Sequence, residues 1–108
     1  MIADLEAAGI PLALLSNAPA THARSIAAQP WMQPFAGHAY FSADLGVIKP
    51  SAEIFGRVLA LLGAEPGEVI FVDDRTENVA TAAAIGMRTV HFTGAQDLRR
   101  RLESFGVL

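Results

Sequence analysis

The 108-residue sequence contains no cysteine. Disulfide bridges, thiolate nucleophiles and zinc-thiolate sites are therefore excluded, and a reducing cytoplasm is compatible with the chain. No apolar run approaches the roughly 20 residues that span a bilayer. The first ten residues carry Asp4 and Glu6, where a secretory signal has basic residues followed by an apolar stretch. We therefore expect a cytoplasmic protein without a membrane partner.

Basic residues are also few, since 8 Lys and Arg face 11 Asp and Glu and give a formal net charge of -3. The basic run at residues 99–101 lies in a helical pattern and is interpreted as a solvated helix face, so no nucleic-acid partner is expected. With 52% hydrophobic and 18% charged residues, the composition is that of a folded soluble chain. The length favours a single domain over residues 1–108.

Apolar residues predict helices that alternate with short strands. Helical spacing, ended in most cases by glycine, predicts helices over residues 1–8, 21–29, 52–62 and 95–104, and another that follows a cap at Thr76 and runs to residue 85. Short apolar runs predict strands over residues 12–15, 39–41, 69–73 and 87–92. Expected helix caps are Ser51 and Thr76 at the amino ends and Gly63 and Gly86 at the carboxyl ends. This order predicts an α/β fold, a Rossmann-like parallel sheet flanked by helices.

Two adjacent carboxylates, Asp73 and Asp74, end the apolar run at residues 69–72. Like charges side by side resist burial, so the pair is expected to face solvent or a cation. A helix cap remains an alternative for the pair taken alone.

Other polar residues follow the strands that precede this pair. Ser16 and Asn17 end the first strand, and Lys49 lies in the loop after the second. Ligands of such sheets bind outside the carboxyl ends of the strands, so all these groups should meet at one rim. A hydroxyl, an ammonium and paired carboxylates suit a phosphate and Mg²⁺. Each residue alone has an ordinary interpretation as a turn or surface residue, whereas their joint placement favours a site.

Three segments of the chain, "LLSNAP", "GVIKPSAEIF" and "VIFVDDRTENVATAAAIGM", resemble in order the second, third and fourth motifs of the haloacid dehalogenase-like (HAD) hydrolases. Within that family, the residues of these motifs are similar to those of sugar-phosphate phosphatases and of the phosphatase domain of soluble epoxide hydrolases. The resemblance implies substrate phosphate binding by Ser16, Asn17 and Lys49. It implies catalytic roles for Lys49 and Asp73, and metal binding by Asp74 directly and by Asn78 through water.

The first motif of that family, Asp-x-Asp on an apolar strand, does not occur in the sequence. It supplies the nucleophile, and the helical cap that selects the substrate is missing as well. By resemblance the absent strand lies between the strands at 12–16 and 69–73, which would leave two apolar edges uncovered. These edges could close on each other, pair with a second chain in a homodimer, or receive a missing N-terminal segment. A fragment of a longer protein is the favoured interpretation.

The function expected from the resemblance is Mg²⁺-dependent hydrolysis of a small phosphorylated metabolite through an aspartyl-phosphate. Without its nucleophile, this chain alone is predicted to be inactive. The alternative is a non-catalytic or partner-dependent HAD-like module. A 2-haloacid dehalogenase is less favoured, because those relatives work without a metal and resemble one another in lacking the adjacent acidic pair. His22, His38 and His91 show no metal-ligand spacing and are expected to be ordinary surface or half-buried residues.

Overall fold

The computed structural model describes residues 2–17, 30–35, 38–45, 49 and 51–108. The helix predicted over residues 21–29 lies outside these residues. The described helices are α1 (Ile2–Ala7), α3 (Ser42–Leu45), α4 (Ala52–Leu62), α5 (Thr76–Ile85) and α6 (Ala95–Ser104). The strands are β1 (Leu14–Ser16), β2 (Ala39–Phe41), β3 (Ile70–Asp73) and β4 (Arg88–His91), with short 3-10 helices η1 (Pro30–Phe35) and η2 (Pro66–Glu68). None of these helices is long and apolar enough to cross a membrane.

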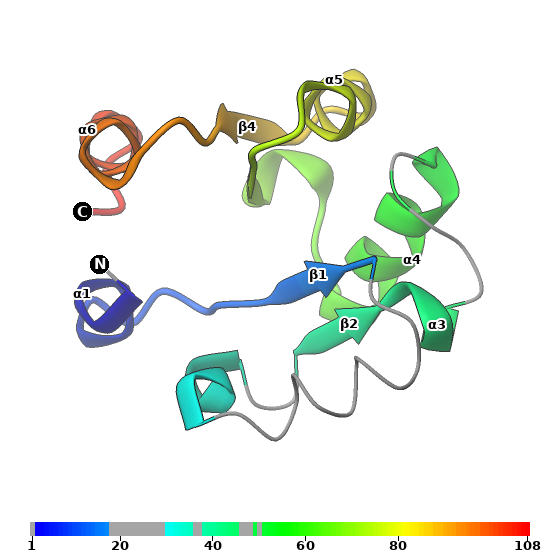
Figure 1. Cartoon of the computed structure of the whole chain (residues 1–108), viewed down its shortest axis with the longest axis horizontal. Helices are drawn as coiled ribbons and strands as arrows, with labels where there is room; N and C mark the ends of the chain where they lie inside the picture. Colours follow the sequence, from blue (N-terminus) through cyan, green and yellow to red (C-terminus); the bar gives the residue numbers. More distant parts are fainter. Residues whose placement is uncertain (1, 18–29, 36–37, 46–48, 50) are drawn as a thin grey trace.

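The four strands form two parallel two-stranded sheets (Figure 1). In one, Leu15 of β1 lies opposite Tyr40 of β2; in the other, Phe71 of β3 lies opposite Thr89 of β4. Within the described part of the chain, β1 and β3 do not pair with each other. The predicted parallel sheet flanked by helices is confirmed, but as two half-sheets. Of the outcomes considered for the two uncovered strands, closing on each other is not observed.

A core cluster beneath α4 contacts both half-sheets. Its buried members come from α4, α5 and the residue before β4, namely Ile54, Phe55, Ala82 and Met87. Leu15 from β1 and Phe71 from β3 pack against this cluster. The rings of Phe55 and Phe71 meet edge to face, with centroids 5.0 Å apart and an interplanar angle of 80°. Because one helix buries residues of both sheets, α4 fixes their relative placement.

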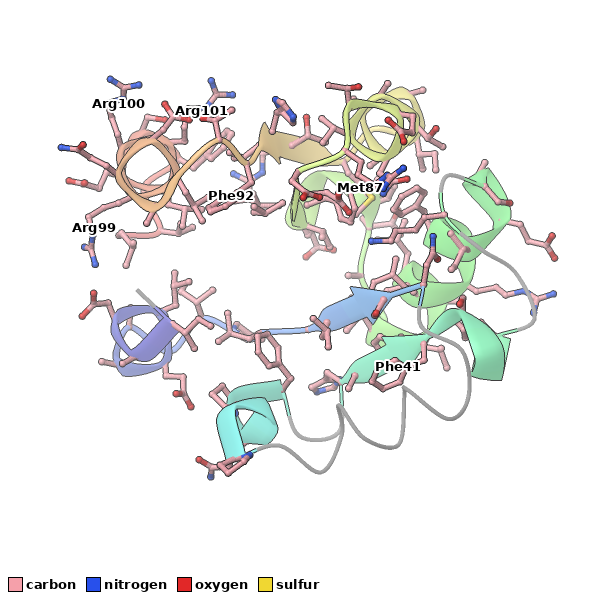
Figure 2. The ribbon with its side chains drawn as sticks, viewed as in Figure 1. Phe41, Met87, Phe92, Arg99, Arg100 and Arg101 are labelled. Atoms are coloured by element: carbon pink, nitrogen blue, oxygen red, sulfur yellow. The ribbon has the colours of Figure 1, made fainter. Side chains whose placement is uncertain are left out.

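A second, smaller cluster belongs to the β1–β2 half alone. Phe41 is buried there against Leu14, Phe35 and Ala39. Figure 2 shows Phe41 on β2, well separated from Met87 in the larger cluster.

The opposite end of the molecule from α4 is joined by an ion pair between α1 and α6. Asp4 of α1 accepts a hydrogen bond from Arg99 of α6, and this contact lowers the pKa of Asp4. Figure 1 shows these helices next to each other, with both chain ends close by. In Figure 2, Arg99 points toward α1, whereas Arg100 and Arg101 point away from the protein. The solvated face expected for the basic run therefore holds for the last two arginines.

Of the two predicted amino-terminal helix caps, one is correct and the other is wrong. Ser51 accepts a hydrogen bond from the Glu53 N–H at 3.2 Å and caps α4, as predicted. Thr76 does not cap α5, because the N-cap residue is Arg75. The Arg75 N–H instead donates to Oδ1 of Asp73 at 2.8 Å. An aspartate that bonds the backbone two residues ahead makes a tight turn, and this turn displaces the predicted cap.

Candidate active site

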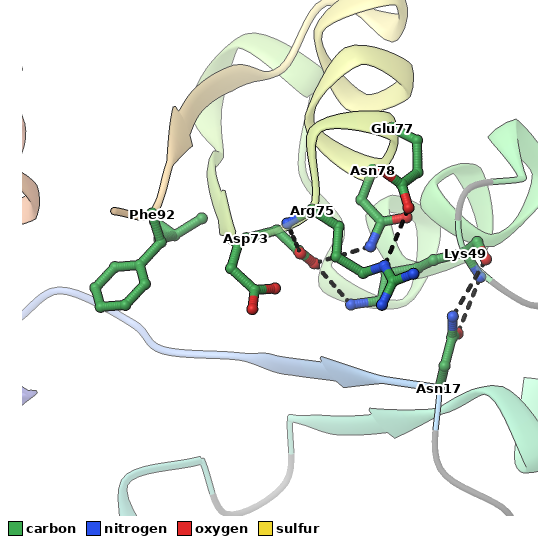
Figure 3. Close-up of a pocket in the computed structure, with 9 residues that line it drawn as sticks. Asn17, Lys49, Asp73, Arg75, Glu77, Asn78 and Phe92 are labelled. Atoms are coloured by element: carbon green, nitrogen blue, oxygen red, sulfur yellow. Dashed lines mark hydrogen bonds and ion pairs between the residues drawn. The ribbon is translucent and has the colours of Figure 1, made fainter. Parts of the chain in front are cut away.

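A cavity of about 640 Å³ opens at the carboxyl ends of the strands (Figure 3). It is lined by five of the six predicted site residues, Asn17, Lys49, Asp73, Asp74 and Asn78, together with Val72, Arg75, Glu77 and Phe92. Ser16 ends β1 as predicted but is not among the lining residues. The sheet topology therefore brings residues from four separate segments to one rim.

Lys49 lines the cavity and is held there by hydrogen bonds to residues of both half-sheets. Its backbone N–H donates to Oδ1 of Asn17 at 3.0 Å, and Nδ2 of Asn17 donates to its carbonyl at 3.2 Å. Its Nζ donates to the Leu15 carbonyl at 3.3 Å and to Oδ2 of Asp73 at 2.8 Å. Asn17 thus positions the lysine in this structure, while its predicted contact with phosphate stays a prediction.

Asp73 is a buried carboxylate whose hydrogen-bonding capacity is largely used. Oδ2 accepts from Lys49 and, at 3.2 Å, from Nδ2 of Asn78, while Oδ1 accepts from the Arg75 N–H. The Lys49 and Asp73 side chains are only 11% and 7% exposed. Burial alone would raise the pKa of Asp73, but these three donors outweigh it and hold that pKa below its ordinary value. Asp73 is therefore ionised at neutral pH and organises the site, while its predicted catalytic role stays a prediction.

Asn78 is 2% exposed on the first turn of α5. Its amide donates to Asp73, as described above. The structure thus shows Asn78 bonded to the neighbouring carboxylate, and its implied role through metal-bound water stays a prediction.

Asp74 differs from Asp73 in the surroundings of its carboxylate. The residue is exposed, and no hydrogen bond or ion pair among the described residues involves its carboxylate oxygens. Its backbone carbonyl is fixed, because Nε2 of His91 lies 2.9 Å away and donates to it. The carbonyl of the preceding residue, Asp73, accepts a hydrogen bond from the Phe92 N–H at 2.8 Å. The backbone that carries the Asp74 carboxylate is therefore held in place by two hydrogen bonds from the end of β4.

His91 makes a contact with the acidic turn that the sequence did not reveal. A lone histidine has no informative spacing, and its relevance comes from the β3–β4 register that sets it opposite Asp73.

The mouth of the cavity carries a second pair of opposite charges. Nε of Arg75 donates to Oε1 of Glu77 at 3.0 Å, and both side chains are more than half exposed. The Glu77 carboxylate raises the pKa of Arg75, while the backbone N–H of Glu77 and then Arg75 lower the pKa of Glu77. Oε1 of Glu77 is thus engaged by Arg75 at the mouth of the cavity.

The donor set fits part of a magnesium site. Mg²⁺ binds oxygen and commonly takes only one or two protein carboxylates, completing its shell with water and substrate phosphate. Asp74 offers one such carboxylate at the cavity rim. Among the described residues, no group of three or more acidic, histidine or cysteine side chains is arranged to hold a metal. Further ligands would have to come from water, substrate or a carboxylate elsewhere.

Comparison with known proteins identifies the family. A family model for haloacid dehalogenase-like hydrolases matches residues 1–86. The chain belongs to the haloacid dehalogenase-like hydrolases. Over 93 residues it is 30% identical to a sesquiterpene phosphatase of Aspergillus oryzae, covering 86% of this chain and 47% of that protein.

Two solved structures share the fold of this HAD-like chain. A HAD family enzyme of Bacteroides thetaiotaomicron, crystallised with magnesium and inorganic phosphate, has a TM-score of 0.74 and 27% identity, over 82% of this chain and 48% of that one. An uncharacterised protein of Corynebacterium glutamicum has a TM-score of 0.78 and 25% identity, over 98% of this chain and 76% of that one. The chain thus spans about half the length of the phosphatase relative and of the Bacteroides enzyme.

Proposed function

We propose that this HAD-like chain forms the phosphate- and metal-binding part of a Mg²⁺-dependent phosphatase that acts on a small phosphorylated metabolite. The observation that carries the proposal is the pairing of two unlike acids at the cavity. Asp73 is bonded to Lys49, Arg75 and Asn78, whereas no described residue bonds the carboxylate oxygens of Asp74. One acid therefore organises the site, and the other would be available to a cation.

Different residues of the chain would bind the phosphate and the metal. Lys49 carries a positive charge at a fixed place, where it attracts a phosphoryl oxygen as a point charge. Ser16 ends the strand beside it and supplies a hydroxyl donor to the same group. Asp74 and, through water, Asn78 would hold Mg²⁺, which when bound neutralises phosphate charge and orients the phosphoryl group.

The nucleophile is the part that the cavity does not contain. Phosphate esters hydrolyse extremely slowly without help, so an activated attacking group is needed. Asp73 is occupied by three donors, and Glu77 is paired with Arg75. Using Asp74 would remove the metal ligand. An aspartyl-phosphate route therefore needs a carboxylate beyond those of the described cavity lining, and loss of a nucleophile typically costs on the order of a million-fold in rate.

A metal titration tests the site without relying on turnover. Mn²⁺ substitutes for Mg²⁺ and broadens NMR signals of nearby amides. We expect broadening centred on Asp74 and Asn78, reversal by excess Mg²⁺, and tighter binding with inorganic phosphate present. Asp74→Asn should abolish the effect, while the matched change Asp97→Asn, on α6, should not. Equal broadening in Asp74→Asn would refute the assigned metal site.

A turnover assay tests the missing nucleophile. Pure 108-residue protein with Mg²⁺ should not measurably hydrolyse p-nitrophenyl phosphate. Robust hydrolysis that depends on Asp74 would show that the chain holds its own nucleophile. A non-catalytic module is the second candidate, favoured by the same lack of a free attacking carboxylate; it predicts Mn²⁺ binding but no turnover even in a longer protein.

A further inference from the structure

Lys49 is bonded at both of its ends to the segment 15–17, where β1 ends. Its backbone N–H donates to Oδ1 of Asn17 at 3.0 Å, and its carbonyl accepts from Nδ2 of Asn17 at 3.2 Å. Its ammonium Nζ donates to the carbonyl of Leu15 at 3.3 Å. One short segment therefore holds both the backbone and the ammonium of the same lysine.

The segment 15–17 is itself fixed by the fold. Leu15 packs against the buried cluster beneath α4, and Ser16 lies opposite Phe41 in the pairing of β1 with β2. The segment can therefore serve as a rigid support for a neighbouring loop.

On its other side, Lys49 is close in sequence to the start of α4. Ser51 caps that helix, and a single proline separates it from Lys49. The residue before a proline has fewer backbone conformations available. The Lys49 backbone thus lies between a capped helix and a paired strand, and the Asn17 side chain makes its contact with the strand.

The Asn17 amide bonds the lysine backbone with both of its polar atoms. Figure 3 shows this side chain reaching from the end of β1 to Lys49, with two hydrogen bonds between them. Bonding the N–H and the carbonyl of one residue together is what a neighbouring antiparallel strand does, and it fixes the orientation of that residue as well as its place.

The position of the backbone decides where the ammonium lies. Nζ donates to Oδ2 of Asp73 at 2.8 Å as well as to Leu15, and the Lys49 side chain is only 11% exposed. Charge-assisted hydrogen bonds depend on distance and direction, so an ammonium that moves binds a phosphoryl oxygen less well. Release of the Lys49 backbone from Asn17 should therefore weaken phosphate binding without any contact between Asn17 and phosphate.

We propose that Asn17 is a positioning residue, which acts on phosphate through Lys49 by holding the lysine backbone against the end of β1. The inference rests on the proposed function, because it takes Lys49 as the cation that binds phosphate. It differs from the role implied by the family resemblance, in which Asn17 contacts phosphate itself. A positioning residue loses its effect once the lysine is absent, whereas a direct ligand keeps it.

A double-mutant cycle separates these two roles. The probe is inorganic phosphate with Mg²⁺ present, followed through the amide NMR signals of Leu15 and Ser16. Asn17→Ala should raise the phosphate concentration for half-saturation about fivefold in the wild-type background. In the Lys49→Met background the same change should alter that concentration by no more than about twofold. Gln96→Ala, which removes an exposed amide on α6, is the matched control and should leave both values unchanged.

The cycle has two outcomes that would overturn the proposal. Equal weakening in both backgrounds would make Asn17 a direct phosphate ligand. An unchanged phosphate affinity in Asn17→Ala would show that the contact with Lys49 does not matter for binding. Lys49→Gln replaces Lys49→Met in the cycle if circular dichroism shows that the methionine variant is unfolded.

A second measurement does not require phosphate. Lys49 is the only lysine in the sequence, so labelling lysine at Cε with ¹³C gives a single side-chain signal. Asn17→Ala should lower the NMR order parameter of this group toward that of an exposed side chain, while Gln96→Ala should not. An unchanged order parameter would overturn the positioning role. If the order parameter falls but the wild-type chain binds no phosphate, Asn17 still holds Lys49 and the proposed function fails.

Discussion

Replacing Lys49 by methionine should destabilise the chain in a pH-dependent way. The substitution keeps most of the apolar stem but removes the bonds from Nζ to Asp73 and to the Leu15 carbonyl. It leaves a nearly buried carboxylate with two of its three donors and a strand carbonyl without its partner. Hydrogen bonds to charged groups are worth about 1.5–3 kcal/mol, so we expect a loss of about 2 kcal/mol at pH 7. That is a large share of the roughly 5–15 kcal/mol that stabilise a typical domain.

The sign of the pH dependence follows from Asp73. Its pKa in the folded protein is held below the unfolded value, so it stabilises the fold above the unfolded pKa of about 3.9. That contribution disappears as the pH falls through the folded pKa. The difference between wild type and Lys49→Met should therefore narrow below about pH 4. A remainder should persist, because the Leu15 carbonyl bond and the position of Nζ 5.9 Å from the Phe71 ring centroid do not depend on Asp73.

Urea unfolding followed by circular dichroism at pH 7, 5 and 3.5 measures the effect. Arg57→Met is a matched control, since Arg57 also bonds one carboxylate, Glu53, and one carbonyl, that of Leu45. The Arg57 and Glu53 side chains are 49% and 58% exposed. Exposed i,i+4 pairs of this kind contribute only about 0.3–0.5 kcal/mol to stability. A loss for Lys49→Met no larger than that of the control, or one that is the same at pH 7 and pH 3.5, would refute the reasoning.

Substitutions at four further positions test the fold and the acidic turn. Phe55→Ala removes a 1% exposed ring that contacts Phe71 and should cost about 3–5 kcal/mol in urea unfolding; a loss below 1 kcal/mol would contradict the shared core. Gly63, at φ 65°, and Gly56, inside α4 with open space at its Cβ position, should respond oppositely to alanine. We expect a loss of roughly 1–2 kcal/mol at Gly63 and a gain of about 0.5–1 kcal/mol at Gly56, and equal signs would contradict the cap. His91→Ala should raise the Mn²⁺ concentration for half-maximal broadening at Asp74 roughly tenfold, with partial recovery in His91→Gln; no change would show that the His91 bond does not orient the turn.

Local signals in the sequence predicted most of the described elements. The boundaries of α4 and α6 and the carboxyl end of α5 agree with the prediction, because helical spacing and glycine at the carboxyl ends of α4 and α5 are visible within one segment. The start of α5 differs, since Thr76 lies inside the helix and not at its cap. The helix α3, with 4 residues, was not predicted, since one turn has no apolar periodicity. The first strand was predicted to begin at residue 12 but starts at Leu14, where pairing with β2 starts.

The candidate site was predictable as a set of residues but not as a set of contacts. The rule that strand ends meet at one rim placed Lys49 and the acidic pair together. It did not show that Asn17 bonds the backbone of Lys49, nor that His91 holds the Asp74 carbonyl. Such contacts depend on loop paths and strand register, which a single sequence does not encode locally.

The residues predicted to bind phosphate and those predicted to bind the metal follow different half-sheets. Ser16 and Asn17 follow β1, whereas Asp73 and Asp74 follow β3. At the rim, Lys49 touches both, through the Leu15 carbonyl on one side and Asp73 on the other. Lys49 therefore connects the residues predicted to bind phosphate with those predicted to bind the metal.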